Sequence, residues 1–192
     1  MFEGSQRGFK IVKLCAIVSL PIFLTDIETL DAHTIVSDYE VKPISLPGAN
    51  GVVVLDHLAY DRARGKLWVP ASNTGSVDVI DESIDTASGI SGFNTDEVEL
   101  EGHKVRLGPT AVCIGNGVAY IGNRGNSTLS IIDSQTLERG ESSQMTPASP
   151  ETGTAPHGVV YVAMTRELWV TTGPGKSIEV FDASKPRHLN GN

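Results

Sequence analysis

The feature that most constrains the fold of this chain is a pattern that occurs three times along it. The segments LWVPASNTGSVDVID, AYIGNRGNSTLSIID and LWVTTGPGKSIEVFD align without a gap, with an aromatic residue second and an aspartate last. The aromatic residues are 52 and then 49 positions apart. A period near 50 residues is typical of a fold that repeats one supersecondary unit. The aligned pairs are Trp68 and Asp81, Tyr120 and Asp133, and Trp169 and Asp182.

Each repeat alternates as a β-strand does. In the first unit, Val77 and Val79 alternate with Asp78 and Ile80. The knuckle between the two strands of each unit contains Gly or Asn, residues that accept the positive φ of a hairpin turn. A further strand is expected before each hairpin, because a β-branched or aromatic run stands there. These runs begin at His57, Thr110 and His157.

An outer strand completes each unit in this interpretation. It is predicted at Asp96–Gly102 in the first unit, and its counterpart in the second unit is expected within residues 140–153. Four antiparallel strands in a repeat of this length make one propeller blade, and no stretch reads as an amphipathic helix. The sequence therefore predicts an all-β fold, a β-propeller present as an incomplete arc of about three four-stranded antiparallel blades.

Two segments carry a resemblance to a known family. GVAYIGNRGNSTLSIIDSQTLE and APHGVVYV resemble the hairpin and the inner strand of the YVTN repeat, found in lactonase-like or surface-layer-type β-propellers. The resemblance runs from about residue 39 to residue 182. It implies a ring of about seven blades, of which this chain would hold the N-terminal portion of about three.

The chain is divided by this reading into a leader, a spacer and a partial propeller. Arg7, Lys10 and Lys13 precede the apolar run Leu14–Leu24, which is the order of a secretory signal peptide and is too short to span a bilayer. We expect a secreted, periplasmic or extracellular protein with no membrane span once the leader is removed; a buried N-terminal element of a cytoplasmic protein is the alternative. The predicted boundaries are 1–24 for the leader, 25–38 for the spacer, and 39–192 for the propeller, with blades at about 56–102, 109–148 and 156–192.

The third blade is expected to lack its outermost strand, and the segment from Tyr39 resembles an outer strand without a hairpin partner. Uncovered strand edges invite pairing with another chain. Two interpretations follow: the chain is a fragment of a longer protein, which we favour, or several arcs assemble. The open blade edges allow self-association.

Charge and cysteine content limit the classes of partner and of chemistry. The formal net charge is −8, and Lys and Arg are scattered singly, whereas a nucleic-acid-binding protein carries a basic stripe. We therefore expect no nucleic-acid partner. With Cys15 in the leader, Cys113 is the remaining cysteine, and we interpret it as a buried structural thiol.

Two histidines at the starts of inner strands are the candidate ligand contacts. His57 and His157 are two blades apart, and Asp56 stands next to the first. Inner strands line the channel of a propeller, so these side chains are expected at its mouth. The equivalent place in the second unit holds Gly108 and Pro109, and a histidine that hydrogen-bonds a neighbouring loop is the alternative.

Other polar residues receive simpler interpretations. Asp81, Asp133 and Asp182 each end a strand before a polar turn, where a carboxylate accepts backbone N–H groups, so we assign them to the scaffold. Asn126 begins an N-glycosylation sequon, which matters only in a secreted eukaryotic protein.

Two functions from different classes remain open. The first is a non-enzymatic, extracytoplasmic binding or interaction scaffold, whose protein or small-molecule ligand would contact blade-top loops such as Asp81–Glu97. No cofactor is expected for it. The second, implied by the family resemblance, is a lactonase-like metal-dependent hydrolase. Its divalent metal would need ligands from further blades in addition to Asp56, His57 and His157.

Overall fold

The computed structural model describes residues 40–100, 102–145, 155–173 and 177–184. The chain divides into two units, Met1–Val41 and Lys42–Asn192, and the strands belong to the second. The predicted leader 1–24 and spacer 25–38 lie outside the described residues.

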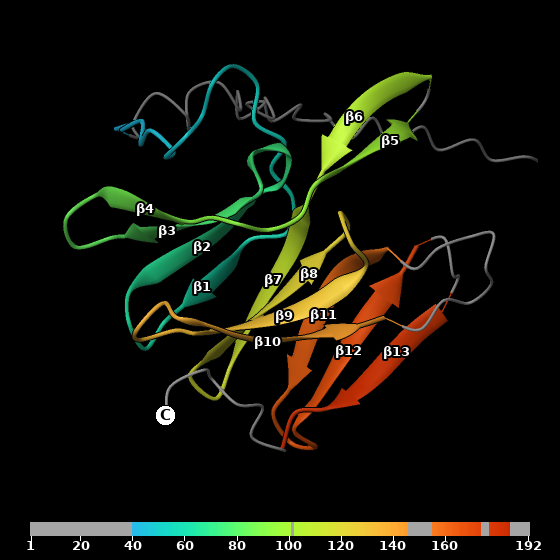
Figure 1. Cartoon of the computed structure of the whole chain (residues 1–192). Helices are drawn as coiled ribbons and strands as arrows, with labels where there is room; N and C mark the ends of the chain where they lie inside the picture. Colours follow the sequence, from blue (N-terminus) through green and yellow to red (C-terminus); the bar gives the residue numbers. More distant parts are fainter. Residues whose placement is uncertain (1–39, 101, 146–154, 174–176, 185–192) are drawn as a thin grey trace, which may run out of the picture. The chain divides into compact units, whose positions relative to one another are not determined.

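Three antiparallel sheets follow one another along the chain, each with its strands hydrogen-bonded in sequence order (Figure 1). The first is formed by β1 (Ala59–Asp61), β2 (Lys66–Ala71), β3 (Ser76–Asp81) and β4 (Thr86–Ile90). The second is formed by β7 (Pro109–Gly115), β8 (Val118–Asn123), β9 (Thr128–Asp133) and β10 (Arg139–Gln144). The third is formed by β11 (Pro156–Val162), β12 (Glu167–Thr172) and β13 (Ser177–Asp182). We call these sheets blades 1, 2 and 3.

The repeated hairpin has the same register in all three blades. The aromatic residue of each unit faces the residue eleven positions later: Trp68 opposes Val79, Tyr120 opposes Ile131, and Trp169 opposes Val180. The gapless alignment of the sequence therefore corresponds to one repeated structural unit.

The turns of the first two hairpins differ in detail. In blade 1 the knuckle contains η1 (Ser72–Thr74), and Gly75 follows in the left-handed region with φ 69°. In blade 2 the positive φ falls on Ser127, at 54°, and not on the Gly or Asn of that knuckle, which corrects the expectation from sequence.

The outer strand of blade 1 was placed wrongly by the sequence reading. The fourth strand is β4, whose Ile90 pairs with Val77 of β3. The predicted strand Asp96–Gly102 instead supplies β5 (Asp96–Leu100), which pairs with β6 (His103–Leu107) as a separate hairpin. The residues of the segment TASGI have low strand propensity, and the segment is a strand because it pairs with the edge of β3. The segment DEVEL alternates apolar and charged residues strongly and pairs with the other strand of its own hairpin.

The segment after Tyr39 also differs from its prediction as an outer strand. Tyr39 itself lies outside the described residues, and residues 40–54 contain no strand. The inner strand of blade 1 is shorter than predicted as well: β1 begins at Ala59, and His57 makes only an isolated bridge to Ala111.

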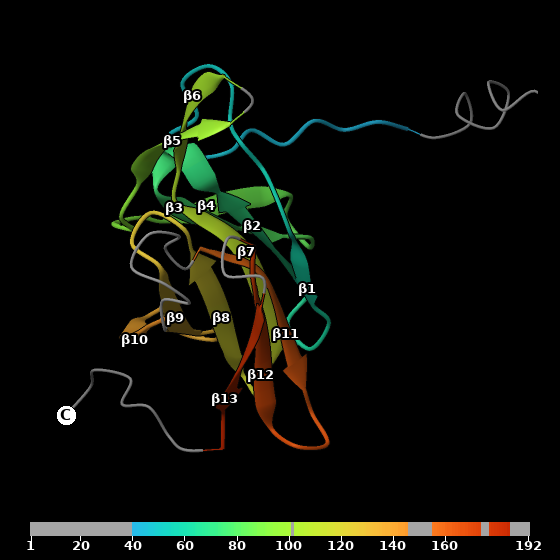
Figure 2. The ribbon, with the colours of Figure 1, turned by 90° about the vertical axis from the view of Figure 1, so that its right-hand side faces the viewer.

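The core lies between consecutive blades. One face of blade 1 packs on blade 2, and the opposite face of blade 2 packs on blade 3, since strand alternation sends every second side chain to each face. Figure 2 shows the inner strands β1, β7 and β11 next to one another. The first cluster includes Trp68, Val77, Val79, Val112, Ile121 and Ile132. The second includes Tyr120, Leu129, Ile131, Val159, Leu168 and Val170.

The chain that precedes blade 1 pairs along the edge of β2 and reaches the other face of the blade at Pro47, since a Cβ at Gly89 would lie 3.3 Å from Cβ of Pro47 and 3.1 Å from Oδ1 of Asp78. Leu55 bridges Ala71, and the Ser72 N–H donates to the carbonyl of Val54 at 2.9 Å. The Asn73 side chain donates to the Val52 carbonyl at 2.8 Å and accepts from the Val54 N–H at 2.9 Å. We call residues 47–55 the covering segment.

A buried carboxylate lies beneath this segment. Asp78 is fully buried and accepts a hydrogen bond from the Ser76 hydroxyl at 3.0 Å. Burial raises the pKa of Asp78, and the bond from Ser76 opposes that change. Consecutive, face-packed blades with adjacent inner strands make the fold an incomplete β-propeller, as the sequence predicts.

Candidate functional site

The structure brings the three predicted contact residues together. The rings of His57 and His157 meet edge to face, with centroids 5.1 Å apart and an interplanar angle of 74°. The Asp56 carboxylate lies 2.8 Å from Nδ1 of His57. Two residues separated by a hundred positions in sequence therefore share one site with the carboxylate.

Hydrogen bonds across three inner segments position the two rings. The His57 N–H donates to the Thr110 carbonyl at 3.0 Å, and the Val112 N–H donates to the His57 carbonyl at 3.2 Å. The Thr110 hydroxyl donates to the Pro156 carbonyl at 3.1 Å. Strand β7 of blade 2 thus links the segment of His57 to the start of β11, where His157 lies.

The carboxylate orients the first imidazole. Because an ionised carboxylate can only accept hydrogen bonds, the Asp56 contact places the proton of a neutral His57 on Nδ1. Its Nε2 atom then keeps a lone pair that can accept a proton or bind a metal ion. The His57 side chain is about half exposed, and His157 is exposed as well, so solvent and ligands reach both rings.

Blade 2 contributes backbone to this site and no third side chain of the same kind. Its Gly108 N–H donates to the Ser72 hydroxyl at 2.8 Å. A Cβ at Gly108 would lie 2.7 Å from the Ser72 carbonyl oxygen, which leaves no room for a larger residue. Among the described residues, no group of three or more His, Cys, Asp and Glu side chains is placed to hold a metal ion.

The repeated aspartates belong to the scaffold, as predicted. Oδ1 of Asp133 accepts the N–H groups of Gln135 and Thr136, both at 2.8 Å. Asp81 and Asp182 each accept the N–H and the hydroxyl of the serine two positions later. These bonds close the turn that follows each repeated hairpin.

The sequon lies in the knuckle between β8 and β9. The Asn126 side chain is half-buried, and its Oδ1 accepts a hydrogen bond from the Thr128 hydroxyl at 2.7 Å. Glycosylation of Asn126 stays a prediction.

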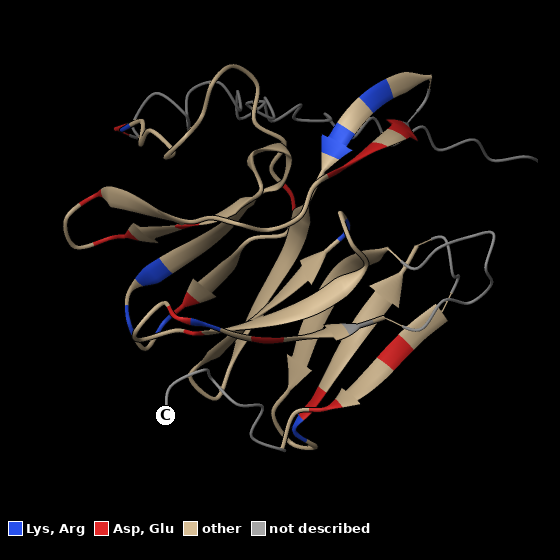
Figure 3. Ribbon diagram, viewed as in Figure 1, with Lys and Arg blue, Asp and Glu red and all other residues tan. Residues whose placement is uncertain are grey.

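The segment Asp81–Glu97, which the sequence predicts as a contact loop, contains strand β4 in its middle. Its end is fixed by Arg139 of blade 2, whose guanidinium lies 4.1 Å from the centre of the Phe93 ring and donates to the Gly92 carbonyl at 2.9 Å. The hairpin of β5 and β6, which sequence reasoning missed as a unit, follows it. Its Lys104 pairs with Glu97 at 2.8 Å, and Figure 3 shows the basic residues of β6 opposite the acidic β5.

Comparison with known proteins gives the fold and no family. No family model matches the chain, and no curated protein matches its sequence. Hydrazine synthase of Kuenenia stuttgartiensis is similar in structure, with a TM-score of 0.51 and 16% identity over 71% of this chain and 35% of that chain.

Two further solved structures are similar at lower scores. The extracellular domain of a one-component system from B. thetaiotaomicron gives a TM-score of 0.44 and 14% identity, over 69% of this chain and 15% of that chain. Streptogramin B lyase gives 0.44 and 13% identity, over 68% and 41%. This chain spans less than half the length of each of these three proteins.

The blades, their common register and the histidine pair at the inner strands define the class: this is a β-propeller repeat protein with a candidate ligand site beside its inner strands. In the described part of the chain, no helix has the length and apolar character needed to cross a membrane.

Proposed function

We propose that this chain is a non-enzymatic binding scaffold of the propeller type that acts outside the cytoplasm and contacts its ligand through Asp56, His57 and His157. The contact between the two imidazoles supports the proposal most directly. Loop-borne and strand-end side chains on a rigid β frame are a common basis for ligand binding. The extracytoplasmic part rests on the leader sequence alone.

A divalent transition-metal ion is the ligand chemistry that suits these groups. Neutral imidazole is a common ligand for zinc, nickel and copper. The two ring centres are 5.1 Å apart, so one ion could bind a nitrogen of each ring after the side chains rotate out of their edge-to-face contact. Asp56 would act as the outer carboxylate that orients a metal-bound histidine.

Two imidazoles leave at least two coordination positions of such an ion open. Open positions accept water or the donor atoms of a second molecule. The ion would therefore connect the scaffold to a small molecule or peptide with carboxylate or imidazole groups, and no chemical step is required of the protein.

Calorimetric titration of the purified chain with Zn²⁺ tests the proposal. We expect one ion per chain, with binding lost in His57→Ala and in His157→Ala, because either change leaves a single imidazole. The Asp56→Asn variant should bind about 10- to 100-fold more weakly, since it disturbs only the orientation of His57. His103→Ala is the matched control, because His103 is an exposed histidine on β6, and its binding should equal that of the native chain.

Zn²⁺ binding that survives both alanine substitutions, or no binding at neutral pH, would contradict the proposed site. Hydrolysis of a lactone by the purified protein, abolished in His57→Ala, would replace the scaffold with the hydrolase. Circular dichroism on each variant shows whether the blades remain folded.

A further inference from the structure

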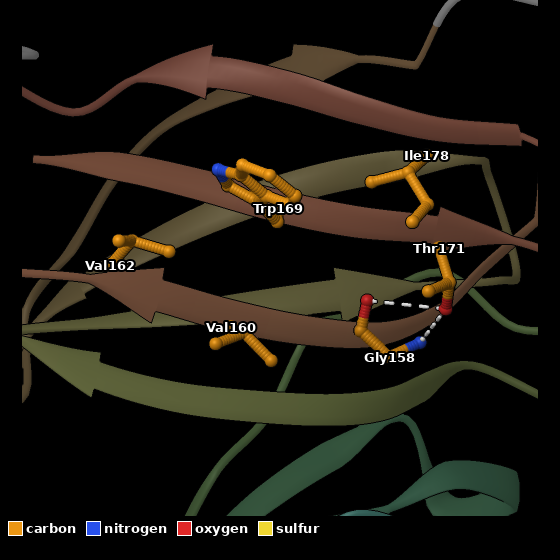
Figure 4. Close-up of a pocket in the computed structure, with 6 residues that line it drawn as sticks. All are labelled: Gly158, Val160, Val162, Trp169, Thr171 and Ile178. Carbon is orange, nitrogen blue, oxygen red and sulfur yellow. Dashed lines mark hydrogen bonds between the residues drawn. The ribbon is translucent and has the colours of Figure 1, made fainter. Parts of the chain in front are cut away.

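The faces of blades 1 and 3 that point away from blade 2 differ in exposure. On blade 3 this face encloses a hollow of about 250 Å³ lined by uncharged residues, and Val160 and Trp169 on it are 59% and 44% exposed (Figure 4). On blade 1 the opposite situation holds, since Val69, Ala71 and Asp78 are 2%, 1% and 0% exposed. A carboxyl group is therefore buried on the closed face of blade 1.

The described surroundings of Asp78 offer it no opposite charge. Its Oδ1 accepts the bond from the Ser76 hydroxyl, while Oδ2 is buried and has no hydrogen-bond partner in the described chain. Lys42 and Asp85, which join the preceding chain to the turn between β3 and β4, pair with each other. Register and strand alternation place only uncharged residues beside Asp78 on this face of the sheet; they are Leu67, Val69, Ala71, Ser76, Ile80, Ala87 and Gly89.

The equivalent positions of the other two blades are occupied differently. Ser130 of blade 2 is also buried, but it is neutral and its hydroxyl hydrogen-bonds that of Ser142 at 2.7 Å. Glu179 of blade 3 carries a charge, but it is only half-buried. In the described part of the repeat, a fully buried carboxyl at this position is thus particular to blade 1.

A carboxyl group in such a place stays buried only while it is neutral. Transfer of an ionised carboxylate away from water is strongly unfavourable unless a cation or several donors compensate it. The group closest to Asp78 from outside the sheet is Pro47, whose Cβ and the Oδ1 of Asp78 both lie within 3.3 Å of the place that a Cβ of Gly89 would take. Displacement of the covering segment would therefore admit water to the carboxyl.

We propose that Asp78 is a pH-sensitive switch for the covering segment 47–55, which stays closed over the protonated carboxyl and is released when the carboxyl ionises. Burial raises the pKa of Asp78 in the closed form, whereas the open form has the ordinary value of about 3.9. Closure is then complete below the ordinary pKa, and it is lost as the pH rises toward the pKa of the closed form. The segment ends one residue before Asp56, so its release loosens the chain that leads into the histidine site.

Hydrogen exchange followed by NMR tests the switch. The N–H groups of Val54 and Ser72 hydrogen-bond at the segment, so their protection, which is the chemical exchange rate divided by the observed rate, measures closure. In the native chain this protection should fall about tenfold per pH unit above about pH 4, until the closed form is ionised as well. The N–H of Ser134, which donates to the Gly117 carbonyl in blade 2, should keep its protection and so exclude unfolding of the whole chain.

Two variants separate the carboxyl from the rest of the segment. Asp78→Asn cannot ionise, so the protection of Val54 and Ser72 should no longer depend on pH. Gly89→Ala adds a Cβ 3.1 Å from Oδ1 of Asp78 and 3.3 Å from Cβ of Pro47, and it should lower this protection even at pH 4. Glu99→Gln, at an exposed position of β5, is the matched control and should behave as the native chain does.

The carbon-13 shift of the Asp78 carboxyl gives its pKa in the same samples. An ordinary pKa for Asp78 would overturn the proposal, as would protection that is independent of pH in the native chain. A pH dependence that persists in Asp78→Asn, as titration of His57 would produce, would overturn it too. Native-like protection in Gly89→Ala at pH 4 would show that Pro47 does not close over the carboxyl.

Discussion

The ionised carboxylate of Asp133 stabilises the turn that follows β9. The N–H groups of Thr136 and Gln135 hydrogen-bond the carboxylate and lower its pKa, and partial burial opposes this. A carboxyl group whose pKa is lower when folded stabilises the protein at any pH above the unfolded pKa, which is about 3.9. That stabilisation is lost as the pH falls through the folded value.

Asp133→Asn should therefore destabilise the protein at pH 7 by about 1 kcal/mol, a figure reduced for the exposure of the group. At pH 3 the cost should be smaller, because pH 3 is below the unfolded pKa and part of the stabilisation that depends on the charge is then lost. Urea unfolding at both pH values measures the difference. Glu141→Gln, at an exposed position of β10, is the control, and an equal cost of Asp133→Asn at both pH values would contradict this account.

Cys113 is partly buried between blades 2 and 3. Burial raises the pKa of its thiol to about 12, against a smaller opposing effect of a backbone hydrogen bond from Tyr161. Since the thiolate is the reactive form, iodoacetamide at pH 8 should modify native Cys113 on the order of a thousandfold more slowly than the unfolded chain. Cys15→Ser isolates the signal for mass spectrometry, and comparable rates in buffer and in urea would disprove the burial effect.

The histidine pair shows how far residue-level prediction reaches. Sequence places His57 and His157 at the starts of inner strands that are two blades apart, with the inner strand of blade 2 between them. The ring separation depends on the link through Thr110, a residue with no distinctive sequence signal. The sequence therefore predicts both histidines at the mouth of the channel, and it does not predict that their rings touch.

At the scale of elements, prediction succeeded where a strand carries its own pattern. The repeated hairpins were found with their register, because the aromatic residue and the closing aspartate fix both strands at once. Strand β10 lies at Arg139–Gln144, close to the expected segment. The outer strand β4 was missed because its residues, Thr86–Ile90, are small and polar and gain their order from the edge of β3.

The hairpin of β5 and β6 was misread for the opposite reason. Its first strand has the alternation of a blade strand, so sequence assigned it to blade 1. That strand instead pairs with the next one along the chain, His103–Leu107. Gly102, with φ 78°, makes the turn between them. A pattern predicts that a strand exists; which edge it joins depends on the competing partners.

At the scale of the whole molecule, a blade buries its faces only with help from its neighbours. Blade 2 has both faces packed by blades, while blade 1 has one face packed by blade 2 and is contacted on the other by Pro47 of the covering segment. Repeat patterns predict the blades well, because they recur. Residues 47–55 occur once and carry no repeated sequence pattern, so their contact with blade 1 could not be predicted from the sequence.

Removal of residues 47–55 should change how the protein associates. A chain that begins at Asp56 would lose the contact of Pro47 and the bonds to Ser72 and Asn73, and it should then expose apolar surface on blade 1 as well as on blade 3. Two different exposed faces can join head to tail without closure, so the shortened chain should form filaments that the longer chain does not form. Electron microscopy and light scattering on the shortened chain would reveal the filaments, and an unchanged particle size would mean that residues 47–55 do not act as a cap.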